Sequence, residues 1–138
     1  MRRIMGFVLI SFIIVSAGWL YWIRVAPSKP TVWHTEPVVV IDQLKRNSVA
    51  RLLETGPDGL ARFHEVASQW PRTEVLAGSV EEGMVTYITR SKRLALPDYT
   101  TAFQDGDELK IFARSRYGKN DFGVNDRRVL KWLQAMEL

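Results

Sequence analysis

The chain has 138 residues and no cysteine, so it has room for one domain plus a short extra segment, and disulfides and thiolate metal sites are excluded. Its formal charge of +4 is unevenly distributed, because three of the nineteen cations flank an apolar N-terminal segment while all fifteen acids follow it. The part from Pro27 onward therefore carries sixteen cations and a charge of only +1. A nucleic-acid-binding domain usually shows a broad basic excess, so we expect no nucleic-acid partner.

The apolar N-terminal segment covers residues 4–23 and contains no charge. Twenty helical residues rise about 30 Å, which is enough to cross the hydrocarbon core of a bilayer. Trp19, Tyr21 and Trp22 lie at its far end, where aromatic rings favour the membrane interface. We therefore expect residues 1–26 to form an uncleaved transmembrane anchor that contacts the lipid bilayer through residues 4–23.

Two features of this segment leave alternatives open. Ser16 and Gly18 could satisfy the small-residue rule of a cleaved signal peptide, although bulky residues follow them without a break. Cations lie on both sides of the segment, with Arg24 and Lys29 after it, so the positive-inside rule favours a cytoplasmic N-terminus only weakly. The expected arrangement is a single-pass membrane protein whose C-terminal domain lies outside the cytoplasm, which in a bacterial protein means the bacterial inner membrane with the domain on its outer side.

Residues 27–47 are expected to form an extended linker or tail. Pro27 and Pro30 fix φ and disfavour a helix. Residues 31–42 contain an apolar run that fits either a strand or a tail packed on the domain. The domain itself is expected to cover residues 48–138.

Two helices are predicted at the start of that domain. The first begins at Asn47-Ser48 and stops at Gly56-Pro57, with apolar residues at helical spacing between them. The second begins at Asp58 and ends at Pro71. Its apolar face consists of Leu60, Phe63, Val66, Ala67 and Trp70. His64 lies beside this face, and we expect a structural histidine there rather than a ligand or a base.

Four strands follow, at residues 73–79, 84–92, 99–104 and 108–116, where β-branched and aromatic residues are frequent. The links between them are short, which favours an antiparallel meander. A last helix presents Val129, Trp132, Leu133 and Met136 at positions i, i+3, i+4 and i+7. The expected fold class is α+β, with two layers: a four-stranded antiparallel meander sheet with helices before and after it on one face, preceded by one N-terminal transmembrane helix. The other sheet face is either exposed or binds something.

Few residues of the chain suggest chemistry. The two histidines are far apart in sequence and lack metal-ligand spacing. Paired acids, at Glu81-Glu82 and at residues 105–108, fall in predicted hairpin turns and are expected to be solvated. Asp105 and Asp107 are not followed by the further ligands of an EF-hand loop. We therefore predict no metal site, no cofactor and no identifiable catalytic residue.

The strongest candidate site is the segment before the last helix, where residues 110–131 hold seven cations against two acids. Glycines here can take up positive φ, and a helix N-terminus presents unpaired amides to an anion. Asn125 is expected to cap the helix. The alternative is an internal latch in which Asp121 is clamped by Arg116 or Arg128. The candidate anion-binding residues are Arg90, Arg114, Ser115, Arg116, Gly118, Asp121, Gly123, Asn125 and Arg128.

Residues 115–128 read S-R-Y-G-K-N-D-F-G-V-N-D-R-R. They resemble the signature S-R-x-G-x-x-D-x-G-x-N-x-x-R of the largely bacterial family named domain of unknown function 1499. W-P-R-T-E-V at residues 70–75 and T-R-S…P-D-Y at residues 89–99 are also similar to members of that family. The resemblance covers roughly residues 31–138. Many relatives place Arg-Ser where this chain has Phe112-Ala113, and Arg114 could replace that arginine.

The resemblance implies a small envelope-associated domain, often behind a membrane anchor or lipoprotein signal, with no known activity. We therefore expect an uncharacterised membrane-anchored envelope domain that acts as a non-enzymatic binding or accessory module for an unknown envelope protein. The alternative is an enzyme or sensor that acts on a small anionic ligand through the Arg-rich loop before the C-terminal helix.

Overall fold

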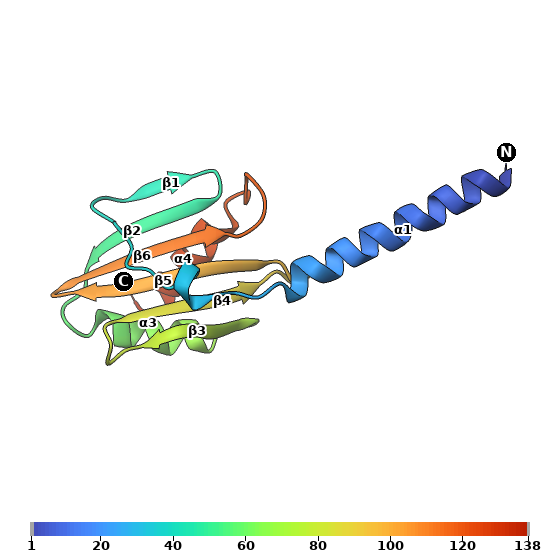
Figure 1. Cartoon of the computed structure of the whole chain (residues 1–138). Coiled ribbons are helices and arrows are strands. Elements are labelled where there is room, and N and C mark those ends of the chain that lie inside the picture. Colours follow the sequence, from blue (N-terminus) through green and yellow to red (C-terminus); the bar gives the residue numbers. More distant parts are fainter. Residues whose placement is uncertain (1, 138) are drawn as a thin grey trace.

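The apolar N-terminal segment forms one long helix, α1 (Arg2–Val25), which projects away from the rest of the molecule (Figure 1). The computed structural model describes residues 2–137. From Arg3 to Val25, α1 is long and apolar enough to cross a membrane, and its most apolar stretch makes no buried contact with the domain. The same length and composition also fit a signal sequence.

The domain is built on a six-stranded antiparallel sheet with the strand order β1-β2-β6-β5-β4-β3. The elements after α1 are α2 (Pro30–Trp33), β1 (Gln43–Lys45), β2 (Ser48–Glu54), α3 (Gly59–Ser68), β3 (Thr73–Ser79), β4 (Met84–Arg90), β5 (Pro97–Asp105), β6 (Glu108–Ser115) and α4 (Val124–Ala135). The predicted four-strand meander is present as β3 to β6. The strand number was wrong, because β1 and β2 extend the sheet beyond β6.

The first predicted helix of the domain is instead strand β2, which is why the sheet is larger than expected. Its residues pair in antiparallel register with β6, from Ser48 opposite Arg114 to Glu54 opposite Glu108. Val49 is 1% exposed in the core, whereas its neighbour Ala50 points to the other sheet face, against Phe112. Short apolar runs fit both helical and strand periods, and here the pairing with a distant strand decides between them.

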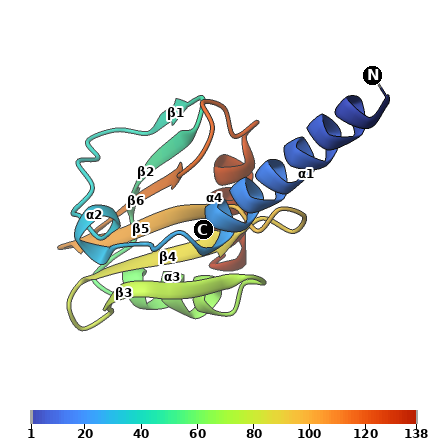
Figure 2. The same ribbon diagram turned by 45° about the vertical axis from the view of Figure 1, so that its right-hand side comes forward.

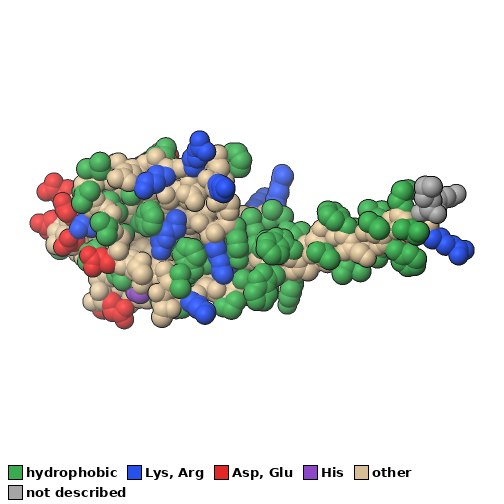
Figure 3. Space-filling model, turned by 45° about the horizontal axis from the view of Figure 1, so that its top comes forward, with side chains coloured by type: hydrophobic (Ala, Val, Ile, Leu, Met, Phe, Trp, Pro, Cys, Tyr) green, Lys and Arg blue, Asp and Glu red, His purple; other side chains and the backbone are tan. Residues whose placement is uncertain are grey.

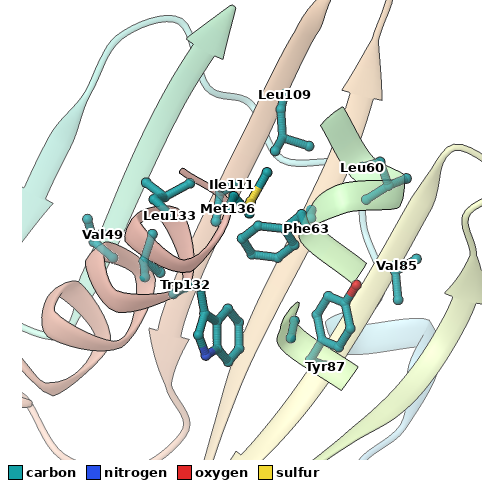
Figure 4. Packing of buried hydrophobic residues seen from close by; sticks show 14 residues of the cluster. Val49, Leu60, Phe63, Val85, Tyr87, Leu109, Ile111, Trp132, Leu133 and Met136 are labelled. Carbon is teal, nitrogen blue, oxygen red and sulfur yellow. The ribbon is translucent and has the colours of Figure 1, made fainter. Parts of the chain in front are cut away.

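Helices α3 and α4 cover one face of the sheet, as predicted, and enclose the core (Figure 4). The predicted apolar stripe of α4 is buried there, and Trp132 is fully enclosed between Phe63 and Tyr87. His64 borders this core and is hydrogen-bonded to the hydroxyl group of Tyr87 at 3.0 Å. Burial raises the pKa of Tyr87 above its ordinary value. His64 is thus a structural histidine, as expected.

The opposite face of the sheet is covered by the tail that follows α1, with α2 lying in front of the strands (Figure 2). Trp33 stacks on Tyr99, with ring centroids 3.9 Å apart and planes inclined by 14°. His34 is hydrogen-bonded to the hydroxyl group of Thr86 at 2.9 Å. The tail also supplies β1, which pairs with β2 along one sheet edge. The second sheet face is therefore occupied by the chain's own N-terminal tail.

Candidate functional site

A buried polar network lies where β5 begins, β6 ends and α4 starts. Asn125, which is fully buried, donates from Nδ2 to Ser115 Oγ at 3.0 Å and to Asp121 Oδ2 at 2.8 Å. Its Oδ1 accepts a hydrogen bond from Arg128 Nη1 at 3.0 Å. Arg128 is 8% exposed and pairs through Nη2 with Asp98 Oδ2 at 2.9 Å. These side chains satisfy one another and tie two strands to the helix.

Asp121 binds backbone amides of the α4 N-terminus. Its Oδ1 accepts from the amide of Gly123 at 2.8 Å, and its Oδ2 accepts from the amide of Asn125 at 3.2 Å. A carboxylate in this position satisfies otherwise unpaired amides and interacts favourably with the helix dipole. Among residues 2–137 no arginine forms an ion pair with Asp121. The predicted clamp by Arg116 or Arg128 was therefore wrong.

The capping role of Asn125 also needs correction. The helix begins at Val124, with Gly123 at the N-cap position, so Asn125 lies inside the first turn and points its side chain into the network. Gly118 and Gly123 have φ values of 90° and 73°, as the turn requires. A Cβ atom on Gly123 would lie 3.0 Å from Arg127 Nη1. The two glycines thus shape the loop around Asp121.

Arg114 and Arg116 point to the opposite face of the sheet, where they hold the tail. Arg114 donates to the carbonyl oxygen of Trp33 and to Thr101 Oγ1, the latter at 3.0 Å. Burial lowers the pKa of the Arg114 guanidinium to about 10. Arg116 donates from Nη1 to the carbonyl oxygen of Ala26 and to the hydroxyl group of Tyr99, both at 3.1 Å. These two arginines are separated from Arg128 by the sheet.

Arg90 and Arg128 meet in a hollow of about 330 Å³ between the end of β4 and the start of α4. We call it the basic pocket; its charged lining residues are Arg72, Arg90, Lys92, Arg127, Arg128 and Lys131. No carboxylate lines it, and within residues 2–137 only Arg128 of these six forms an ion pair. The other five cations are therefore uncompensated at short range. Such a pocket is suited to anions with several oxygen atoms.

The nine predicted site residues are thus distributed over three places. The loop network holds Ser115, Gly118, Asp121, Gly123, Asn125 and Arg128; the basic pocket holds Arg90 and again Arg128; the tail contacts hold Arg114 and Arg116. Their binding of an anion stays a prediction. Four cations of the pocket were missed because they lie on separate elements: Arg72 precedes β3, Lys92 follows β4, and Arg127 and Lys131 lie on α4. Their signal was indirect: Arg72 and Lys92 fall in or beside the two short motifs near residues 70–75 and 89–99.

Comparison with known proteins links the chain to a single family description. A model described as "Protein of unknown function (DUF1499)" matches residues 26–136, which is most of the chain and all of its sheet. No curated protein and no solved structure matches the chain. The match begins directly after α1 ends, so it concerns the domain with its tail and leaves the N-terminal helix outside.

Proposed function

The chain belongs to the DUF1499 family, whose description assigns no activity, and from the structure we propose that it is a non-enzymatic accessory module held at a membrane by α1. In this role the domain stays at the surface of a bacterial inner membrane, on the side away from the cytoplasm. It is available there to an envelope partner. The partner is a protein or a ligand of that compartment.

The observation that carries this proposal is the set of contacts between the end of α1 and the domain. Arg24 Nε donates to the carbonyl oxygen of Leu94 at 2.9 Å, and Arg90 Nη1 donates to the carbonyl oxygen of Arg24 at 3.0 Å. Ile23 and Ala26 are 8% and 6% exposed. These contacts hold the end of α1 on the domain, which supports a helix that belongs to the folded protein. Cleavage after Gly18 would leave them in place, so the mass measurement below decides between an anchor and a signal peptide.

The non-enzymatic part of the proposal is supported by the use of the signature side chains. Asn125, Ser115, Arg128 and Asp98 hydrogen-bond with one another, and Asp121 with the helix amides. Buried polar groups with satisfied partners rigidify a fold, and a catalytic group needs a free lone pair or proton facing a substrate. These residues therefore suit a structural role.

We expect the mature protein to keep residues 1–26. Intact-mass measurement of the chain purified from membrane fractions should give the mass of the full sequence, apart from the initiator methionine. A shortened chain that begins within residues 16–24 and appears in the soluble fraction would contradict the anchor.

We also expect the domain to lie outside the cytoplasm. A C-terminal alkaline-phosphatase fusion should be active in a bacterial host, because this enzyme requires an oxidising compartment. The matched control is a C-terminal fusion to a fluorescent protein that folds only in the cytoplasm, which should stay dark. An inactive phosphatase beside a bright fluorescent fusion would reverse the orientation.

The second candidate is recognition of a small anionic ligand, by a sensor or an enzyme. The basic pocket favours it, because five cations that form no ion pair within residues 2–137 line one hollow. In this candidate the anion binds in the basic pocket, between α4 and β4, instead of in the loop before α4. Arg90 and Arg128 are the predicted site residues that both locations share.

A further inference from the structure

The antiparallel topology sorts the turns of the domain by charge. Alternate turns of a meander lie at the same end of its sheet. The turns at the α1 end carry the cations Lys45, Arg46, Arg72, Lys92, Arg93, Arg116 and Lys119. The turns at the far end carry the acids Asp58, Glu81, Glu82, Asp105 and Asp107. Figure 3 shows blue side chains near the junction with α1 and red ones gathered at the opposite end.

The basic pocket lies at the level where α1 ends. Arg24 is the first charged residue after the apolar segment, so it marks the depth of the lipid headgroups if α1 spans the bilayer. The carbonyl oxygen of Arg24 accepts a hydrogen bond from Arg90, a lining residue of the pocket. Leu94, in the adjoining turn, accepts one from Arg24. One hydrogen bond therefore links the pocket directly to the end of α1, and a second links the adjoining turn to it.

Most acids at this end of the domain are already engaged. Asp98 pairs with Arg128, Asp121 binds amides, and Asp126 pairs with Arg51 at 2.5 Å. Glu74 lines a second hollow beside the pocket, together with Arg72, Arg90 and Lys92. Lys92, Arg127 and Lys131 remain exposed in the pocket itself. The electrostatic potential is therefore positive at the end of the domain that faces the bilayer.

Apolar side chains project beside these cations. Phe122, at the tip of the loop before α4, is 80% exposed, and Leu94, in the turn between β4 and β5, is 44% exposed. Phe122 has a positive φ of 53°, and its carbonyl oxygen accepts a hydrogen bond from Arg127 of the pocket. Aromatic and aliphatic side chains flanked by Lys and Arg are typical of segments that enter the membrane interface.

We propose that the basic pocket, through Arg72, Arg90, Lys92, Arg127 and Lys131, binds phosphate groups of anionic phospholipids in the leaflet where α1 ends. Phe122 and Leu94 then rest in the interface, and the acidic far end points away from the membrane. This inference rests on the proposed anchoring of the chain by α1. Lipid binding at the pocket fixes the tilt of the domain, which a single helix alone does not.

The test uses the full chain in nanodiscs of phosphatidylcholine, alone or mixed with phosphatidylglycerol. The rate at which an amine-reactive reagent labels Lys92 and Lys131 is measured by mass spectrometry, with Lys110 at the far end as the internal reference. Each cation near an anionic surface raises the affinity for the membrane about fivefold. A lysine held at a lipid phosphate is shielded from the reagent. We therefore expect the labelling rates of the two pocket lysines to fall by about fivefold or more in the anionic discs. Labelling of Lys110 should not change. High salt should abolish the difference.

Two variants locate the effect. Arg72→Gln/Arg127→Gln should largely remove the protection of Lys92, whereas Lys45→Gln/Arg46→Gln, which deletes the same charge at the other edge of the same end, should retain it. If both variants lost the protection of Lys92 equally, net charge alone would explain the protection, and the proposed binding of lipid in the pocket would be wrong. The labelling comparison in the unmodified chain does not depend on how either variant folds.

Two further outcomes would overturn the lipid assignment. Equal labelling rates in neutral and anionic discs would exclude headgroup binding. Protection by millimolar inorganic phosphate in neutral discs, to the same extent as by phosphatidylglycerol, would assign the pocket to a soluble anion. Failure of the anchor itself is recognised separately, because a chain that lacks residues 1–26 does not enter the discs.

Discussion

Replacing Asp98 by alanine is expected to destabilise the domain by about 3–5 kcal/mol, because it leaves a buried guanidinium without its carboxylate. The side chains of Asp98 and Arg128 are 13% and 8% exposed, and their closest atoms are 2.9 Å apart. Arg128 would keep only its bond to Asn125. A domain of this size typically has a stability of about 5–15 kcal/mol, so the loss should be evident. It is measured by urea unfolding of the full chain in mild detergent, followed by tryptophan fluorescence.

The control removes both partners. Asp98→Ala/Arg128→Met should cost clearly less than the sum of the two single changes, since no buried charge is then stranded. Asp121→Asn is a second comparison: it breaks no ion pair among the described residues and disturbs the hydrogen bonds from two helix amides and from Asn125 Nδ2, so we expect a smaller loss of about 0.5–2 kcal/mol. If Asp98→Ala lost less unfolding free energy than Asp121→Asn, water would be solvating Arg128 and the ion pair would add little to stability.

The second large effect is expected for Trp132→Ala, which should destabilise the domain by about 3–5 kcal/mol through lost burial and a cavity. Trp132 is fully buried, and its ring meets those of Phe63, Tyr87 and Trp70 edge to face, with centroids 5.5, 6.0 and 6.2 Å away. It thus joins both helices to the sheet. The same unfolding assay applies, and near-ultraviolet circular dichroism reports the loss of aromatic packing.

A matched control lies two residues away on the same helix. Leu130 is 41% exposed, so Leu130→Ala should change stability by about 0.5 kcal/mol or less. Trp132→Phe should be much milder than Trp132→Ala, because it keeps a ring in the site and removes a buried indole N–H for which the described residues provide no hydrogen-bond partner. Equal losses for Trp132→Ala and Leu130→Ala would place Trp132 outside the cooperative core.

The folded positions of the arginines explain why the sequence alone grouped side chains that the structure separates. The segment before α4 is dense in cations, but Arg114, in β6, and Arg116, just after β6, both point to the tail side of the sheet. Arg72 and Lys131, which lie far apart in sequence, meet in one hollow because α3 and α4 pack side by side on the sheet. Charged residues that are close together in the sequence therefore need not lie on the same surface of the folded protein.

The sequence by itself determined the features that depend on neighbouring residues. Periodicity is local, so the amphipathic stripe of α4, the face of α3 and the β3–β6 meander could be predicted, and the positive φ of Gly118 and Gly123 follows from turn chemistry. The tertiary structure alone decided what depends on distant partners. Strand β2 exists because β6 offers it a complete antiparallel edge, and Asp98 rather than Asp121 pairs with Arg128 because the start of β5 lies within reach of that side chain. Backbone pairing and charge pairing require contact in space, and only the folded chain brings those groups together.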